Sequence, residues 1–196
     1  MTPIGQVFGI LFRPQTEWQA IEREPGGTAR LLLGYVAILS LIPAIAWFIG
    51  VSIIGISVSI GTFRVPTRAD LTSVAIGYVA TFAIVYVVAV VTDWLAPTFE
   101  SQRSFANALK LSVYSHTAIW ISGIFLLHPR LRFLAYFLGL YGFYLAWTGL
   151  PVLFKTPREK RLMFMLAIVV STLIVYVILG IVVNTVSGIS GARRAL

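Results

Sequence analysis

The sequence predicts an all-α membrane protein: a bundle of about five transmembrane helices with an N-terminal interfacial amphipathic helix. Hydrophobic residues make up 58% of the 196-residue chain, charged residues make up only 11%, and the mean hydropathy is +0.90. A soluble domain is about 45–50% apolar and roughly 25% charged, so this chain lacks the charges that would cover a surface in water. Its apolar residues also form long uncharged runs separated by short basic connections. A run of about 20 such residues spans the hydrocarbon core as a helix.

Five apolar segments are candidates for these helices. The first stays uncharged from Leu31 to Phe63, which is too long for one span. We expect its helix to end near Gly50 and to kink at Pro43, which has no backbone N–H to donate. Residues 51–63 then form either an interfacial loop or an extension of the helix. The transmembrane domain covers residues 31–190, a short tail covers 191–196, and the expected spans are about 31–50, 71–93, 109–127, 133–154 and 162–186.

The basic residues predict the orientation of these spans. An odd number of spans places the termini on opposite sides of the membrane, and the cytoplasmic side carries the excess of Lys and Arg. Nine basic residues fall on the N-terminal side and six on the other, so we expect a cytoplasmic N-terminus and an external C-terminus. The net charge of +8 lies in loops that face anionic lipid headgroups. We therefore expect the lipid bilayer as partner, and no nucleic acid.

Residues 1–30 form the predicted cytoplasmic interfacial segment. No basic residue precedes its apolar stretch, so we expect no signal peptide and a retained N-terminus. Trp18 and Ile21 lie three residues apart on one helical face, and Glu17, Glu22 and Arg23 point elsewhere. An apolar face opposite a charged face predicts a helix lying in the membrane interface, or one packed on the cytoplasmic rim of the bundle. Trp18 is therefore a candidate contact for lipid or for a partner.

No combination of residues in the sequence indicates catalysis. The chain has no cysteine, and its two histidines do not have the spacing of a metal-binding motif. Apart from Asp93, no carboxylate lies near the middle or end of a span, whereas catalysis requires several groups to converge. We expect a protein that is not an enzyme, with no catalytic residues, no cofactor and no metal.

Asp93 and His116 are the candidates for a polar path through the membrane. An ionisable side chain at membrane depth is costly and often marks the route of an ion or proton. Asp93, at the end of the second span, could instead pair with Arg103 or cap the backbone. His116 could bond between helices as a neutral ring, relay protons or bind a metal. If the second and third spans form a hairpin, Asp93 and His116 could approach one another.

A basic cluster between the fourth and fifth spans is the second candidate site. It could bind anionic lipid headgroups or an acidic partner, or simply anchor the topology. Its members are Lys155, Arg158, Lys160 and Arg161. Lys110 is a further loop-side anchor that can reach the interface. In the fourth span, small residues four apart permit close helix packing within the bundle or in a homo-oligomer: Ala135 with Gly139, and Gly142 with Ala146.

Several motifs resemble the bacterial Yip family of membrane proteins. They are LFRPQTEWQAI (Leu11–Ile21), FANALKLSVYSH (Phe105–His116), LHP (Leu127–Pro129) and the aromatic-rich YGFYLAWTGLPVLFKTPREKR (Tyr141–Arg161). One departure is that SHTAIW, which follows Tyr114, lacks the proline common in family members. The resemblance implies a five-helix fold in the bacterial cytoplasmic membrane with a cytoplasmic N-terminus. Eukaryotic members associate with Rab-type GTPases in membrane traffic, a role that we do not carry over to this chain.

Two functions of different classes fit these observations. In the first, a non-enzymatic membrane protein organises the membrane or partner proteins through a cytoplasmic face made of the N-terminal segment and the basic cluster. In the second, a small ion or solute transporter or channel uses Asp93 and His116. The organising hypothesis predicts that neutralising the basic cluster abolishes function. The transporter hypothesis predicts that Asp93→Asn and His116→Ala abolish it.

Overall fold

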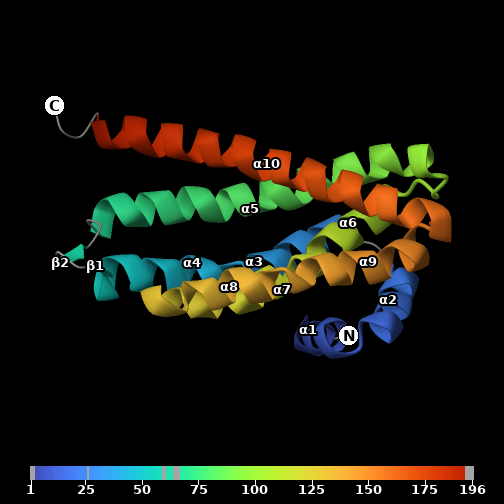
Figure 1. The fold of residues 1–196 in the computed structure, drawn as a ribbon, viewed down its shortest axis with the longest axis horizontal. Coiled ribbons are helices and arrows are strands. Elements are labelled where there is room, and N and C mark those ends of the chain that lie inside the picture. Colours follow the sequence, from blue (N-terminus) through green and yellow to red (C-terminus); the bar gives the residue numbers. More distant parts are fainter. Residues whose placement is uncertain (1–2, 26, 59–60, 64–66, 193–196) are drawn as a thin grey trace.

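The N-terminal segment forms two short helices at one end of the bundle. The computed structural model describes residues 3–25, 27–58, 61–63 and 67–192. Helix α1 (Pro3–Phe12) and helix α2 (Pro14–Arg23) meet at Arg13, whose φ of −138° ends the helical backbone. Pro14 occupies the first position of α2, where its missing N–H costs nothing. Figure 1 shows both helices against the end of the bundle where α9 finishes.

The first long helix runs from Arg30 to Ile54 in four pieces: π-helical η1 (Arg30–Val36), α3 (Ala37–Leu39), α4 (Leu41–Phe48) and π-helical η2 (Ile49–Ile54). The break falls at Ser40, whose Oγ donates to the carbonyl of Val36 at 2.7 Å. This position is about one turn before Pro43, which cannot donate to the carbonyl four residues earlier. The helix is therefore interrupted on the N-terminal side of the proline, and the kink at Pro43 stays a prediction.

Residues 51–63 combine the two expected conformations. The helix continues to Ile54, and Gly55 then turns the chain with a φ of 85°, a value that favours glycine. A small antiparallel hairpin follows, with β1 (Ile56–Val58) paired to β2 (Gly61–Phe63). Residues 59, 60 and 64–66 lie outside the described part of the chain.

The remaining helices run back and forth along the same long axis (Figure 1). They are α5 (Thr67–Leu95), 3-10 helix η3 (Ala96–Phe99), α6 (Phe105–Ser115), α7 (Thr117–Ser122), 3-10 helices η4 (Gly123–Leu127) and η5 (Pro129–Leu131), α8 (Arg132–Gly139), α9 (Tyr141–Leu153) and α10 (Arg158–Ala192). Helix α10 ends at the opposite end of the bundle from α1 and α2 (Figure 1). Of the expected tail, residues 193–196 lie outside the described part.

In the described part of the chain, four helices are long and apolar enough to cross a membrane: Arg30–Ile54, Leu71–Phe99, Pro129–Leu153 and Arg158–Val183. The expected third span, 109–127, is helical along most of its length but is interrupted at His116 and tightens to a 3-10 helix from Gly123. Its first part is also the most enclosed, because every residue from Ala108 to Tyr114 is buried. The all-α membrane fold is confirmed. The expected third span is an interrupted helix whose first part is enclosed by the other helices.

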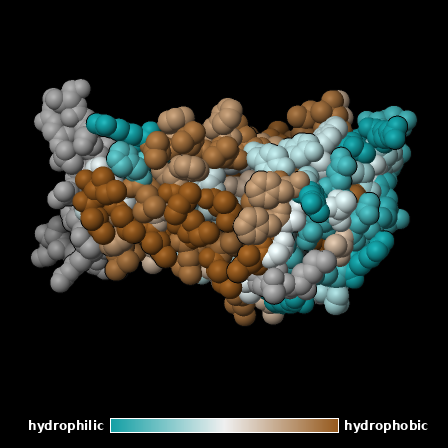
Figure 2. Space-filling view, turned by 90° about the horizontal axis from the view of Figure 1, so that it is seen from below, coloured by the Kyte–Doolittle hydropathy of each residue, from teal (hydrophilic) through white to brown (hydrophobic). Residues whose placement is uncertain are grey.

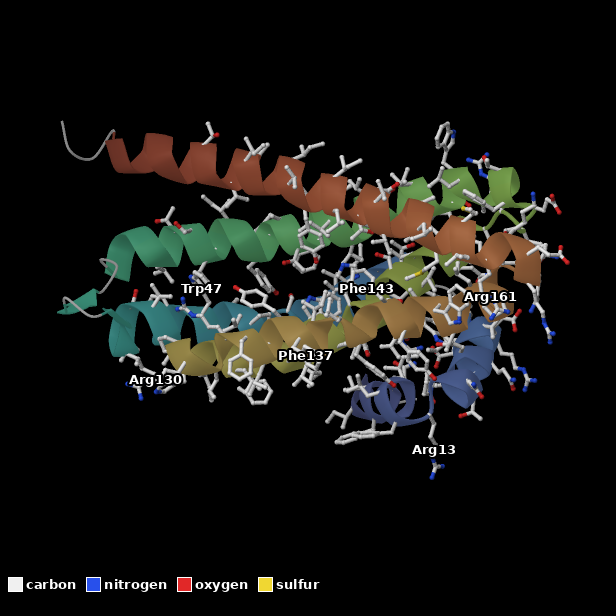
Figure 3. All side chains as sticks on the ribbon, in the orientation of Figure 1. Arg13, Trp47, Arg130, Phe137, Phe143 and Arg161 are labelled. Atoms are coloured by element: carbon white, nitrogen blue, oxygen red, sulfur yellow. The ribbon has the colours of Figure 1, made fainter. Side chains whose placement is uncertain are left out.

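The outer surface of the bundle is apolar over the middle of its length. Figure 2 shows hydrophobic residues there and hydrophilic residues gathered at the end where α2 lies. Large exposed side chains include Leu33, Ile45, Val79, Val90, Phe133, Phe137, Leu162, Val170 and Val177. Arg13 and Arg161 lie toward one end and Arg130 toward the other, with Phe137 between them (Figure 3). An apolar surface of this extent would be unstable in water and is the surface that contacts lipid tails.

Candidate functional site

The N-terminal helices are joined to the bundle through Trp18. Its side chain is fully buried, and Nε1 donates to the carbonyl of Leu145 at 3.1 Å and to Thr148 Oγ1 at 3.2 Å. The ring crosses Tyr114 edge-on and covers Gly149, where an added Cβ would lie 2.8 Å from the indole. Of the two expectations for this segment, packing on the rim of the bundle therefore holds for α2. In this structure Trp18 is not available to lipid or to a partner.

Lys110 holds the other end of α2. Its ammonium donates to the carbonyls of Glu22 at 3.2 Å and Glu24 at 2.7 Å, just where α2 ends, and the residue is only 4% exposed. A helix C-terminus carries unpaired carbonyls and a partial negative charge, both of which an ammonium group satisfies. Lys110 therefore caps α2 inside the protein instead of reaching out to the interface.

Most members of the basic cluster have partners within the chain. Lys155 pairs with Glu22 of α2, Lys160 lies 3.4 Å from Glu100, and the guanidinium of Arg161 stacks over Trp147 at 5.3 Å. Arg158 is exposed. These contacts are partly exposed to solvent, so each contributes little to stability. The cluster ties α2 and the loops together, and its binding of anionic lipid remains a prediction.

Helix α1 presents an apolar stripe to the outside. Ile4, Phe8 and Phe12 are 72%, 60% and 74% exposed, and they lie four residues apart on one face of the helix. The rings of Phe8 and Phe12 stack with centroids 6.1 Å apart. On the other face, Ile10 is completely buried. The sequence contains this four-residue spacing, although the residue predicted to contact lipid or a partner was Trp18 of α2. The exposed stripe belongs to α1.

Glu17 lies at the contact between the two N-terminal helices. Its carboxylate fills the space beside Gly9 of α1, and buried Oε1 has no hydrogen-bond partner among the described residues. Burial and the nearby negative charge of Glu24 raise the pKa of this carboxyl above 4.5. The folded protein therefore favours the protonated form of Glu17 at the contact between α1 and α2.

Asp93 is paired at the end of α5. Its Oδ2 accepts from Arg103 Nε at 3.1 Å, as the sequence suggested for a residue in the headgroup region. The arginine side chain is largely exposed, so the pair lies at the edge of the bundle. The pair compensates the charge of Asp93 through Oδ2, while buried Oδ1 has no hydrogen-bond partner among the described residues.

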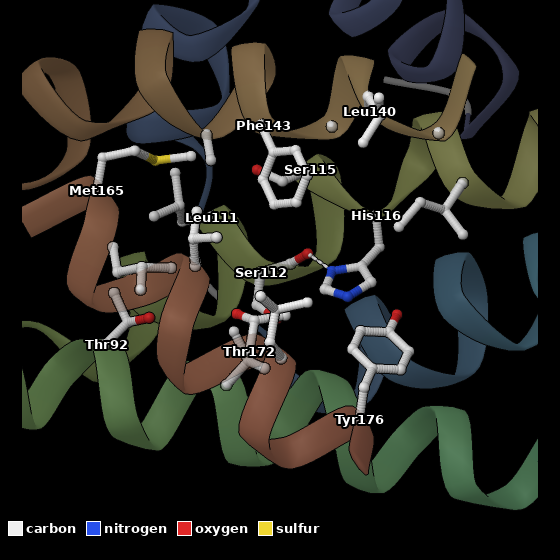
Figure 4. Close-up of a pocket in the computed structure, with 18 of the residues that line it drawn as sticks. Thr92, Leu111, Ser112, Ser115, His116, Leu140, Phe143, Met165, Thr172 and Tyr176 are labelled. Atoms are coloured by element: carbon white, nitrogen blue, oxygen red, sulfur yellow. Dashed lines mark hydrogen bonds between the residues drawn. The ribbon is translucent and has the colours of Figure 1, made fainter. Parts of the chain in front are cut away.

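His116 lies at the break between α6 and α7 and faces a cavity. Its Nδ1 lies 2.7 Å from the carbonyl of Ser112, and the residue is 7% exposed (Figure 4). The cavity has a volume of about 350 Å³ and lies between α5, α6, α7, α8, α9 and α10. Its walls are almost entirely apolar, and Leu111, Phe143, Met165 and Ile168 contribute to them.

The structure does not bring the two path candidates together. Within the described residues, no hydrogen bond or ion pair joins Asp93 to His116, and Asp93 is absent from the lining of the cavity. No group of three potential metal ligands occurs in the described part of the chain either. The polar end and the cavity are therefore two separate sites. The polar end comprises α1, α2 and the loops at 96–104 and 154–157.

The fold and these two sites define a class: a helical membrane protein with a two-helix N-terminal unit packed on the bundle and an apolar cavity between its helices. The Yip1 domain model matches residues 8–181, so the chain belongs to the Yip1 domain family. It is similar to the inner membrane protein YohC of Escherichia coli K12, with 28% identity over 166 residues that cover 82% of this chain and 85% of YohC. YohC from E. coli O6:H1 matches to the same extent. No solved structure matches the chain.

This likeness and the apolar helices support an integral protein of a bacterial inner membrane. The resemblance of the motifs to the Yip family is thereby confirmed.

Proposed function

We propose that the protein is a non-enzymatic organiser of the membrane that acts through α1 on its cytoplasmic face. The observation that carries this proposal is the stripe of Ile4, Phe8 and Phe12, which stays exposed although α1 is fixed to the bundle. Burying such a side chain in an apolar environment stabilises by about 1.5–3 kcal/mol. The headgroup and acyl boundary beside the bundle is the nearest environment that supplies it.

Contacts to the bundle and to α2 hold α1 in place. The hydroxyl of Tyr141 in α9 donates to the carbonyl of Leu11 at 2.9 Å, and Gln6 Nε2 donates to the carboxylate of Glu24 at 2.8 Å. Through Trp18 and Lys110, α2 is in turn joined to α9 and α6. A helix held in this way displaces lipid headgroups at a defined place next to the spans. It would therefore act on leaflet packing wherever the protein sits.

Charge supports the assignment of this end to the cytoplasm. Arg13, Arg23 and Arg158 are exposed around α1, α2 and the start of α10. Basic groups at a membrane surface attract anionic headgroups by about 1 kcal/mol each. Together with the greater number of basic residues on this side, they favour a cytoplasmic N-terminus and an external C-terminus.

The position of the stripe can be measured by fluorescence. Because the chain has no cysteine, Phe8→Cys and Thr16→Cys each provide a single attachment point for an environment-sensitive dye. In lipid nanodiscs we expect blue-shifted emission from position 8, which would lie in the leaflet. The control at position 16, an exposed site on α2, should report water. Equal, water-like emission from both would show that α1 does not enter the membrane.

The organising role has its own test. Amphipathic helices sense the packing and curvature of lipids. We expect the wild-type protein to concentrate on membrane tubes pulled from giant vesicles, and the triple variant Ile4→Ser, Phe8→Ser, Phe12→Ser to distribute evenly. The variant Gln15→Ser, Gln19→Ser alters exposed polar positions of α2 and should behave as wild type. No difference between the triple variant and wild type would contradict the proposal.

A further inference from the structure

The cavity beside His116 contains unused hydrogen-bonding atoms. His116 Nε2 and Ser115 Oγ are both buried, and neither has a partner among the described residues. Both residues line the cavity, whose other walls are apolar. A buried polar atom without a hydrogen bond costs about 1–3 kcal/mol, so a structure rarely retains one unless something else supplies the bond.

The hydrogen bond to Ser112 defines what His116 can bind. A carbonyl oxygen only accepts, so Nδ1 carries the proton in the 2.7 Å contact with Ser112. No carboxylate contacts the ring in the described part of the chain, and a charged imidazolium buried among apolar side chains would be costly. The ring is therefore neutral, and Nε2 presents a lone pair to the cavity. That atom accepts a hydrogen bond and cannot donate one.

Neighbouring contacts hold this geometry. Ser112 Oγ donates to the carbonyl of Val85 in α5 at 2.9 Å, which fixes the residue that orients the imidazole. Thr117 follows His116 at the start of α7, and its Oγ1 lies 2.9 Å from the hydroxyl of Tyr35. On the cavity side, the ring of Tyr176 from α10 stacks beside His116 (Figure 4). The acceptor is thus preorganised in the wall of the cavity.

The mouth of the cavity opens toward lipid. Its lining includes Tyr136 of α8, Leu140 between α8 and α9, and Leu173 of α10, which are exposed on the outer surface. Leu140 lies near the middle of the apolar helix 129–153, and Leu173 lies within the apolar part of α10. The entrance is therefore at membrane depth, and a ligand reaches it from the bilayer. The volume of about 350 Å³ is at the small end of the roughly 300–1,000 Å³ typical of small-molecule sites.

We propose that this cavity binds a single-chain lipophilic alcohol, whose hydroxyl group donates to His116 Nε2 while its apolar chain fills the cavity. A hydroxyl group fits because it can donate to Nε2, whereas an ester, ether or ketone oxygen could at most accept from Ser115 Oγ and would leave Nε2 unpaired. A carboxylate or phosphate headgroup would be an uncompensated charge among apolar walls. This inference is independent of the role proposed for α1, and its test does not involve that helix.

Photolabelling with a matched pair of probes tests the proposal. The probes are a photoreactive long-chain primary alcohol and its methyl ether, added to the purified protein in nanodiscs. Because one hydrogen bond separates them, we expect the alcohol to bind about threefold to tenfold better. Peptide mapping should place its crosslinks on α9 and α10. Equal labelling by alcohol and ether would overturn the proposed recognition of a hydroxyl group.

Variants connect the labelling to this cavity. His116→Phe keeps a flat ring but removes the hydrogen-bond acceptor. In this variant we expect the alcohol to label the protein no more strongly than the methyl ether does. Leu173→Trp should block the mouth and reduce labelling by both probes, while Leu166→Trp changes an equally exposed leucine of α10 outside the cavity. If Leu173→Trp acts no more strongly than Leu166→Trp, the ligand does not enter here. Should His116→Phe fail to fold, the leucine pair and the wild-type ratio still decide.

Discussion

The polar end and the cavity use side-chain polarity in opposite ways. At the polar end, Trp18, Lys110 and Lys155 all bond to partners far away in the sequence, and these bonds join α2 to α6 and α9. In the cavity, His116 and Ser115 keep buried atoms unpaired. Long-range bonds of this kind make the contact between α2 and the bundle rigid, whereas unpaired atoms that face an apolar cavity can bond a ligand. The polar end also has a buried atom without a partner among the described residues, Glu17 Oε1, but its carboxylate lies against Gly9 of α1 and not in the cavity. This difference suggests that the rigid region holds α1 in place and the open one binds a ligand.

The largest effect is expected from the residue that joins the two N-terminal helices to the bundle. Trp18→Ala removes a fully buried indole and its hydrogen bonds, and we expect a loss of about 3–5 kcal/mol. In detergent, the α1–α2 unit should become open to trypsin after Arg23. Trp94→Ala is the matched control, because Trp94 is 70% exposed and its removal should leave protection unchanged. Equal protection of both variants would show that Trp18 does not hold the unit.

A smaller effect is expected from the cap of α2. Lys110→Met keeps the apolar stem but leaves the carbonyls of Glu22 and Glu24 without their donor. Such buried groups cost about 1–3 kcal/mol when unpaired, so thermal unfolding should begin at a lower temperature. Lys160→Met removes a partly exposed ion pair and should change the unfolding temperature little. If both variants unfold alike, the bonds from Lys110 to these carbonyls do not stabilise the protein.

The pH dependence of stability should reflect Glu17. Its pKa is raised above 4.5 in the folded protein, so the folded state binds the proton more tightly than the unfolded chain does. Stability is therefore gained as the pH falls toward 4.5 and lost as the pH rises through the folded pKa. Glu17→Gln should weaken this dependence and raise the unfolding temperature slightly at neutral pH. Thermal unfolding of both proteins from pH 4.5 to neutral pH measures it, and parallel curves would contradict the assignment.

The smallest effect should follow from Asp93→Asn. The ion pair with Arg103 is partly exposed, so its loss should cost less than about 1 kcal/mol. Since Asp93 is paired and lies outside the cavity, we also expect no ion or proton flux into proteoliposomes that depends on it. A flux present in the wild type and lost in Asp93→Asn would favour the transporter hypothesis over the organising role.

The sequence predicted the class of fold because apolar length and basic loops are local properties of the chain. It also identified the face of α2, since Trp18 and Ile21 are both buried, but not what that face contacts. Lipid and a neighbouring helix are both apolar, so the spacing of one helix does not distinguish them. The break at His116 and the cavity depend on packing between six helices, which no single segment encodes. The pairing of Asp93 was foreseeable because Arg103 follows in the next loop.

The attachment of Trp18 also has a consequence during synthesis. The carbonyl and hydroxyl that it binds belong to residues 127 and 130 positions later in the chain. A ribosome adds roughly 5–20 residues per second, so these partners emerge about 6–25 seconds after the indole does. Throughout that interval the indole lacks the two acceptors that it has in the folded protein. The docking of α2 on α9 therefore waits until most of the chain has been made.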